Sequence, residues 1–126
     1  MMTNKVAIVT GGSRGIGRAC AVGLAEDGFD IVVNYAGNKA AADAVVAEII
    51  AMGRKAVAVQ GDVANEADVT AIFAAADKLG PLKALVNNAG VVDVAQPVVE
   101  MSTERLRRMF DINVMGSFFC AREAIK

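Results

Sequence analysis

Short apolar runs alternate along this chain with longer stretches whose apolar residues recur at helical spacing. Four runs are short and rich in Val, Ile, Ala or Leu, as buried strands are; they span residues 5–10, 30–34, 55–60 and 82–86. The stretches between them predict helices over about 16–27, 41–52 and 66–78. A last helix is expected to begin at Ser102 or Thr103 and to bury one face made of Leu106, Phe110, Asn113, Ser117 and Ala121.

Turn-forming and capping residues separate these elements. Gly28, Gly53 and Gly80-Pro81 each follow a predicted helix, where glycine and proline end helices, and Asn65 can cap the third helix. Strands separated by helices of this length pair in parallel through right-handed crossovers. The pattern therefore predicts an α/β fold, the N-terminal half of a Rossmann-type doubly wound parallel sheet with strand order 3-2-1-4. A ligand cleft is expected at the carboxyl ends of strands 1 and 4, where the order reverses.

The turn after the first strand reads Thr10-Gly11-Gly12-Ser13-Arg14-Gly15-Ile16-Gly17. Gly11 allows a tight turn, Gly15 leaves room for a pyrophosphate, and Gly17 lets helix and strand pack closely. The helix that begins here directs unpaired N–H groups and a partial positive charge towards an anion, and the turn itself adds a hydroxyl and a cation. This stretch predicts a nucleotide phosphate site, although a βα turn that merely needs small residues would read similarly.

Composition narrows the class of protein. Apolar residues make up 55% of the 126 residues, above the roughly 45–50% of an average domain, which suits elements buried on both faces. A net charge of −1 without a basic cluster argues against nucleic acid as a partner. The apolar runs are too short to span a membrane, and the N-terminus lacks a signal-peptide pattern, so a cytoplasmic location is expected.

Residue types exclude some chemistries. The absence of histidine excludes His-based triads and the usual zinc sites, so no metal is expected. The two cysteines, Cys20 and Cys120, lie far apart in the sequence without metal-ligand spacing. They are interpreted as reduced intracellular thiols.

Four segments carry a resemblance to the short-chain dehydrogenase/reductase family. Residues 10–17 match its motif Thr-Gly-x-x-x-Gly-x-Gly, and Asn87-Asn88-Ala89-Gly90 after the fourth strand matches its second motif. Asp62-Val63 resembles the family's Asp-Val after the third strand, and Asn113-Val114-Met115-Gly116-Ser117 its Asn-x-x-Gly/Ser segment. Within the family, the chain is most similar to the 3-oxoacyl-carrier-protein reductase and related ketone-reductase branch.

The resemblance implies roles for these residues. The first Asn of the second motif would brace the sheet, while Asn88, Ala89 and Gly90 would border the adenosine ribose. The carboxylate of Asp62, next to Val63, would lie near the adenine amino group. From the residues alone, an ordinary Asn-Gly turn and a helix-flanking aspartate remain open.

Asn113 is the single catalytic residue that the resemblance implies here. It would distort the last helix and hold a water in the proton relay, whereas a buried structural asparagine is the alternative. The family's catalytic Tyr-x-x-x-Lys lies on a helix. Tyr35 and Lys39 have that spacing, but Gly37-Asn38 between them disfavours a helix, and they follow the second strand at the adenosine end.

The resemblance covers the whole chain but only about the first half of a family member. Residues 1–126 are therefore expected to form a dinucleotide-binding domain truncated before the catalytic Ser, Tyr and Lys. By itself such a piece is expected to be marginally stable or prone to aggregate, because its fourth strand would expose an apolar edge.

Coenzyme preference can be predicted from charge. NAD(H) binders usually carry an acid at the end of the second strand, which bonds the ribose 2′-hydroxyl. Here that end reads Asn34-Tyr35-Ala36, whereas Arg14 could bond a 2′-phosphate. A charge-assisted bond is worth about 1.5–3 kcal/mol, a ten- to hundredfold preference. NADP(H) is therefore predicted over NAD(H).

The sequence thus predicts an oxidoreductase that transfers hydride between NADP(H) and a small-molecule carbonyl or secondary alcohol, of the 3-oxoacyl or other ketone reductase type. A non-catalytic nucleotide-binding module or inactive fragment is the alternative; a methyltransferase would usually need an acid in place of Asn34. A homo-oligomer, tetramer or dimer, is expected through the last helix, with Met115, Phe118 and Phe119 off its sheet-facing stripe. The predicted coenzyme-binding residues are Gly11, Ser13, Arg14, Gly15, Ile16, Gly17, Asn34, Tyr35, Ala36, Asp62, Val63, Asn88, Ala89 and Gly90.

Overall fold

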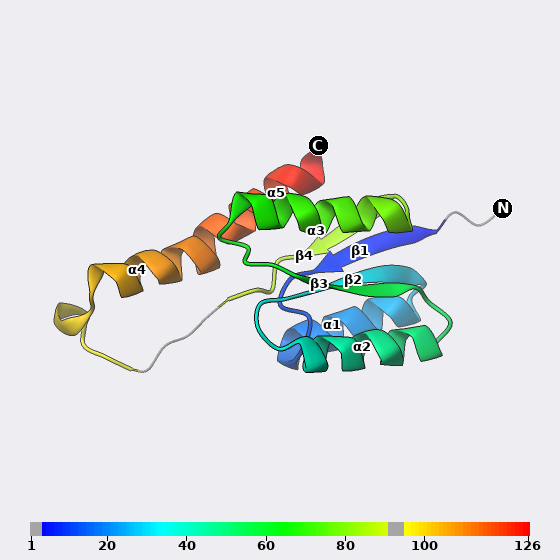
Figure 1. Cartoon of the computed structure of the whole chain (residues 1–126), viewed down its shortest axis with the longest axis horizontal. Helices are drawn as coiled ribbons and strands as arrows, with labels where there is room; N and C mark the ends of the chain where they lie inside the picture. Colours follow the sequence, from blue (N-terminus) through cyan, green and yellow to red (C-terminus); the bar gives the residue numbers. More distant parts are fainter. Residues whose placement is uncertain (1–3, 91–94) are drawn as a thin grey trace.

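A four-stranded parallel sheet in the order β3-β2-β1-β4 forms the centre of the computed structural model, which describes residues 4–90 and 95–126. The predicted strand order and parallel pairing are confirmed. The strands are β1 (Lys5–Val9), β2 (Phe29–Tyr35), β3 (Ala56–Gln60) and β4 (Leu82–Val86). Helices α1 (Gly15–Glu26) and α2 (Lys39–Ala51) cover one face, and α3 (Glu66–Leu79) and α5 (Gly116–Ile125) cover the other (Figure 1).

The central strands are buried on both faces, which is why they appear in the sequence as unbroken apolar runs. In β1, Val6 and Ile8 pack towards α3 and α5, whereas Ala7 and Val9 pack towards α1 and α2. All four are fully buried. Two hydrophobic layers therefore hold the sheet, one on each side, as a doubly wound fold requires.

The ends of the first three helices follow local rules. The side chain of Asn65 accepts the Asp68 N–H at 3.1 Å and caps α3 as predicted. Gly28 and Gly53 follow α1 and α2 with φ of 96° and 88°, a conformation that suits glycine. A cap that the sequence reading missed is Asn38, whose side chain accepts the Ala41 N–H at 3.0 Å at the start of α2.

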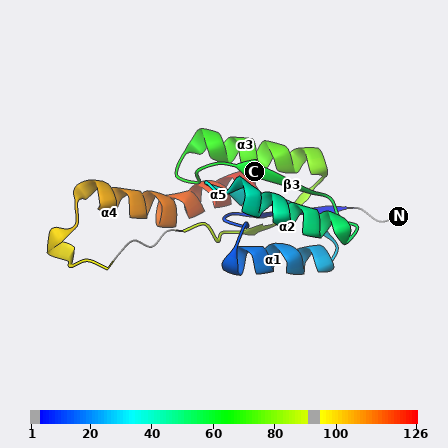
Figure 2. The ribbon, with the colours of Figure 1, turned by 60° about the horizontal axis from the view of Figure 1, so that its bottom comes forward.

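The pattern predicted a single last helix. In the structure this region has three parts. These are α4 (Thr103–Phe110), a π-helical turn η2 (Asp111–Met115) and α5; a short 3₁₀ turn, η1 (Val98–Glu100), precedes them. The Ser102 side chain accepts the Arg105 N–H at 3.1 Å, so the predicted start is confirmed. In Figures 1 and 2, α5 lies on the body beside α3, whereas α4 projects beyond the sheet.

The predicted buried face of this helix is wrong. Ile112, Gly116 and Cys120 are the buried residues, whereas Leu106, Phe110 and Asn113 are exposed. The reason is Gly116, where an added Cβ would clash with Val63, so the helix approaches the body most closely at its smallest residue. Across residues 4–90 and 95–126, the structure has no helix with the length and apolar character to cross a membrane.

Candidate functional site

Three loops meet at the carboxyl ends of the strands, and Thr10 joins two of them. Its hydroxyl accepts the N–H groups of Asn88 and Ala89, both at 3.0 Å, and donates to the Val86 carbonyl at 3.3 Å. Thr10 is 1% exposed. The Thr10 side chain therefore ties the glycine turn after β1 to the segment after β4. The sequence reading gave Thr10 no role, although it is the first residue of the glycine motif.

Two asparagines hold Gly11 from opposite sides. The Gly11 N–H donates to Asn34 Oδ1 at 3.2 Å, and the Gly11 carbonyl accepts from Asn88 Nδ2 at 3.0 Å. Gly11 has φ of 61°, in the left-handed region that glycine adopts at little cost. The backbone of the turn is thus fixed by hydrogen bonds within the protein.

Asn34 lies behind the glycine turn. It is 2% exposed, and its Nδ2 donates to the Val59 and Gly61 carbonyls at 3.2 and 3.1 Å. The neighbouring Tyr35 is also buried, so Ala36 is the exposed residue of the three predicted at the end of β2. The protein contacts of Asn34 make it a brace for the turn.

The two glycines at the start of α1 differ in their surroundings. A Cβ at Gly17 would overlap the Gly11 carbonyl and Asn88 Nδ2, so α1 and the turn pack as closely as glycine allows. A Cβ at Gly15 would meet nothing within 4 Å, and Gly15 has φ of 58°. The space above Gly15 is therefore open, and it lies beside the N–H groups that begin α1.

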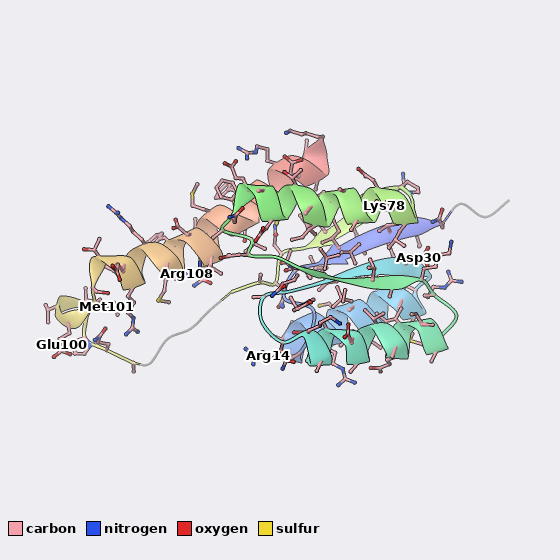
Figure 3. The ribbon with its side chains drawn as sticks, in the orientation of Figure 1. Arg14, Asp30, Lys78, Glu100, Met101 and Arg108 are labelled. Atoms are coloured by element: carbon pink, nitrogen blue, oxygen red, sulfur yellow. The ribbon has the colours of Figure 1, made fainter. Side chains whose placement is uncertain are left out.

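These N–H groups and Arg14 give the turn its positive character. The first backbone hydrogen bond of α1 runs from the Arg18 N–H to the Arg14 carbonyl at 3.2 Å, so the N–H groups of residues 15–17 precede it. Arg14 is exposed and, among the described residues, its guanidinium has no hydrogen bond or ion pair. Figure 3 places Arg14 at the start of α1, on the side towards which α4 projects. Ser13 is half-buried and Ile16 is 76% exposed. The turn can accept an anion.

The segment after β4 meets the π turn. A Cβ at Gly90 would lie 3.1 Å from Asn113 Oδ1, so the two residues are in close proximity. The helix is distorted at Asn113, as the resemblance implied. Asn87 Nδ2 donates to the Ser117 carbonyl at 3.2 Å and so braces β4 to α5. Asn113 is brought to the same edge of the sheet as the glycine turn.

Asp62 begins the turn between β3 and α3. Its Oδ1 accepts the Ala64 N–H at 2.9 Å, and its Oδ2 lies 2.8 Å from Nη1 of Arg108 on α4. Partial burial by itself would raise the pKa of Asp62, but the hydrogen bonds from Arg108 and Ala64 outweigh it and lower the pKa below its ordinary value. Val63, predicted with Asp62 as a coenzyme-binding residue, is 4% exposed, and its side chain packs in the core. Sequence reasoning missed Arg108, because 46 residues separate the pair.

Tyr35 and Lys39 do not form a catalytic pair. Tyr35 ends β2 and Lys39 begins α2, so the two do not share a helix. Lys39 Nζ lies 2.7 Å from Asp43, and that hydrogen bond raises the pKa of Lys39. The rejection of this pair is supported by their positions.

The cysteines and acidic groups add no further chemistry to this edge. Cys20 packs on the α1/α2 face and Cys120 on the α3/α5 face, both as free thiols. Burial raises the pKa of Cys120 to about 11, so its thiol stays protonated. In the part of the chain that the structure describes, no group of three or more His, Cys, Asp or Glu could hold a metal ion.

A protein-family model and individual relatives of known sequence agree on the family of this chain. Residues 5–126 match the family model described as short chain dehydrogenase. The chain is 47% identical over 122 residues to "Uncharacterized oxidoreductase YgfF" of Escherichia coli and 45% identical over 126 residues to a 3-oxoacyl-[acyl-carrier-protein] reductase of Synechocystis. The alignments cover 96% and 99% of this chain but 49% and 51% of those proteins, so the chain spans about half their length.

A solved structure agrees with this similarity. The short chain dehydrogenase of Burkholderia cenocepacia in complex with NADP has a TM-score of 0.91 and 39% identity to this chain, over 96% of this chain and 49% of that one. The strand order, the glycine turn after β1 and the match over residues 5–126 all lead to the same assignment. This chain belongs to the short chain dehydrogenase family.

Proposed function

We propose that residues 1–126 supply the dinucleotide-binding part of an oxidoreductase that transfers hydride between NADP(H) and a carbonyl or secondary alcohol. The observation that carries this proposal is the glycine turn between β1 and α1. Its protein-side groups are held by Thr10, Asn34 and Asn88, while Gly15 and the N–H groups that begin α1 remain open. A pyrophosphate is the group that such a turn suits.

Each residue near the turn then has a part in binding. The pyrophosphate would lie over Gly15, against the N–H groups of residues 15–17, with the Ser13 hydroxyl beside it. Ala89 and Gly90 would border the adenosine ribose, and the Asp62 carboxylate would accept a hydrogen bond from the adenine amino group. The remaining predicted residues would act as supports: Gly11, Gly17, Asn34, Tyr35, Val63 and Asn88 shape the turn, and Ile16 and Ala36 lie at its margin. The coenzyme, when bound, supplies the hydride.

Arg14 supports NADP(H) over NAD(H). Its exposed guanidinium is without a partner in the described residues, and no acid stands at the end of β2, where Asn34 is buried. The Burkholderia cenocepacia structure, similar to this chain, holds NADP. A 2′-phosphate would give Arg14 a charge-assisted partner that a 2′-hydroxyl does not.

The proposed substrate is a ketone of the 3-oxoacyl type, which the Synechocystis relative supports by its name. Asn113 would hold a water in the proton relay, since it lies beside Gly90 at the same edge as the turn. The chain's single tyrosine is in β2, so the tyrosine, lysine and serine of the relay are proposed to lie outside residues 1–126. Hydride transfer from NADPH to an acetoacetyl thioester by the full-length protein, followed by absorbance at the nicotinamide band, tests the substrate class.

Assembly through the last helix is part of the proposal. Met115 and Phe118 are 43% and 68% exposed and would face a second copy, whereas Phe119, expected with them, packs partly on the core. Light scattering that gives a monomer would refute this assembly. The free thiols on opposite faces of the sheet fit a reducing compartment, and the cytoplasm is proposed.

The decisive experiment is a titration of the protein with NADPH and NADH, followed by nicotinamide fluorescence, in the native protein and in Gly15→Val. The native protein should bind NADPH ten- to hundredfold more tightly than NADH, by the single charge-assisted bond. The valine would fill the open space over the turn and would strain a backbone whose φ is 58°, so binding of both coenzymes should be lost. A native protein that unfolds cooperatively but binds neither coenzyme would overturn the proposed function.

A further inference from the structure

Arg108 joins α4 to the turn after β3 by a hydrogen bond and an ion pair. Nη1 of Arg108 lies 2.8 Å from Asp62 Oδ2 (Figure 3 labels Arg108 on α4). Since α4 projects beyond the sheet, this side chain reaches back to the body across 46 residues of sequence. The contact therefore joins the helix that leads to Asn113 with the loop at the proposed adenine end of the site.

Arg108 is not needed to fix the backbone of that loop. The Asp62 N–H already donates to Asp68 Oδ2 at 2.9 Å, the Asn65 side chain caps α3, and the Asn65 N–H donates to the Asp62 carbonyl at 2.9 Å. What Arg108 adds is a second bond to the Asp62 carboxylate, whose other oxygen takes the Ala64 N–H. Two bonds from different directions fix the plane of the carboxylate, and each oxygen retains a further lone pair for a donor.

A plain surface ion pair is the alternative explanation. The side chains are 59% and 33% exposed, and pairs of this exposure contribute little to stability. An effect confined to stability would therefore be small. An effect on the orientation and charge of the carboxylate would instead change the affinity of Asp62 for a hydrogen-bond donor on a ligand. While the carboxylate is ionised, both of its oxygens accept hydrogen bonds and neither donates.

We infer that Arg108 is a positioning residue for the adenine ring. It holds the Asp62 carboxylate in the orientation in which an oxygen accepts a hydrogen bond from the adenine amino group. The inference rests on the proposed function, in which Asp62 meets that group. Arg108 itself is not required to touch the coenzyme. The lowered pKa of Asp62 agrees, since an ionised carboxylate is the form that accepts.

The test compares two coenzymes in the same variants. NADPH carries the adenine amino group, and reduced nicotinamide hypoxanthine dinucleotide phosphate has a ring carbonyl in its place. Arg108→Met removes the charge, Arg108→Lys retains it, and Arg107→Met is the matched control, because the exposed Arg107 has no partner within residues 4–90 and 95–126. Fluorescence titration gives both dissociation constants, and kinetics of the full-length protein, which would carry the proposed relay groups, give KM and kcat.

Arg108→Met should weaken NADPH binding by about three- to tenfold, the value of roughly one hydrogen bond, and should raise the NADPH KM with kcat unchanged. The hypoxanthine coenzyme should lose less than twofold, Arg108→Lys should recover most of the NADPH affinity, and Arg107→Met should match the native protein. Equal losses for both coenzymes, no loss, or tighter NADPH binding would each overturn the inference. A native protein that binds NADPH well while Arg108→Met changes nothing would overturn the inference alone and leave the proposed function intact.

Discussion

Replacing Thr10 by valine should loosen the joint between β1 and β4. The Thr10 hydroxyl accepts two N–H groups at 3.0 Å, from Asn88 and Ala89, and valine keeps the shape of threonine without the oxygen. Each buried donor left without an acceptor costs about 1–3 kcal/mol. Asn88 and Ala89 are half-buried, so water recovers part of this cost. We therefore expect the free energy of unfolding to fall by about 2–4 kcal/mol, within the summed penalty for two donors.

Urea denaturation followed by circular dichroism measures this loss, with Thr10→Ser as the control. Serine keeps the hydroxyl and removes one buried methyl group, which costs about 1 kcal/mol. The midpoint should therefore fall much further for valine than for serine, with similar slopes in both variants. If Thr10→Val were within about 0.5 kcal/mol of Thr10→Ser, a difference too small for even one orphaned donor, the three hydrogen bonds would not hold the loops together as argued.

Three further changes test the site. Arg14→Met should weaken NADPH binding about ten- to hundredfold and leave NADH within twofold, by loss of a charge-assisted bond to the 2′-phosphate; equal losses in a fluorescence titration would contradict this. Asn34→Asp should lower the free energy of unfolding by about 2 kcal/mol or more instead of conferring NAD(H) preference, because a carboxylate cannot donate to the two carbonyls that the amide now contacts; an unchanged urea midpoint would refute it. The folded pKa of Asp62 lies below its ordinary value of 3.8, so its stabilising contribution is present above the unfolded pKa and is lost as pH falls through the folded pKa. The NMR shift of its carboxyl carbon should report a midpoint below 3.8, and a higher midpoint would show that the ion pair does not govern the group.

The sheet could be predicted because its signals are local. Val6 and Ile8 face one layer of helices while Ala7 and Val9 face the other, and burial on both faces requires apolar residues at every position. Asn65 and Ser102 were recognisable because a capping side chain bonds the N–H group three residues later in the chain. Such features depend on few residues, and the sequence displays them directly.

The orientation of the last helix could not be predicted from its apolar residues. Leu106 and Phe110 suggested one face, but the contact of Gly116 with Val63 turns a different face towards the body. A small residue gives no signal in a hydrophobic pattern, although it sets where two elements approach most closely. The π turn, with Asn113 at its centre, followed only from the resemblance to a family and not from periodicity.

The position of a polar residue at a strand end also left its partner undetermined. Asn34 lies near the end of β2 and Asp62 follows β3, and both were predicted to meet the coenzyme. In the structure, Asn34 faces inward and bonds three backbone groups, whereas the Asp62 carboxylate lies partly exposed beside Arg108. Which of the two is accessible depends on contacts between β2 and β3 and between α4 and the β3–α3 turn, and these contacts join residues distant in the sequence.

The glycine turn is held before any ligand arrives, and this has a consequence for affinity. Thr10, Asn34 and Asn88 bond the turn only through groups that point into the protein, so the N–H groups at the start of α1 are left facing outward. A loop ordered in advance does not have to lose conformational freedom when an anion binds. Changes at Thr10 should therefore weaken coenzyme binding although the Thr10 side chain does not contact the coenzyme. The loss should appear as slower association or a higher dissociation constant, even where most of the protein remains folded. Changes at Arg14 should instead alter the choice between coenzymes. Stability of the turn and selectivity for the 2′-phosphate thus depend on different residues of one eight-residue segment.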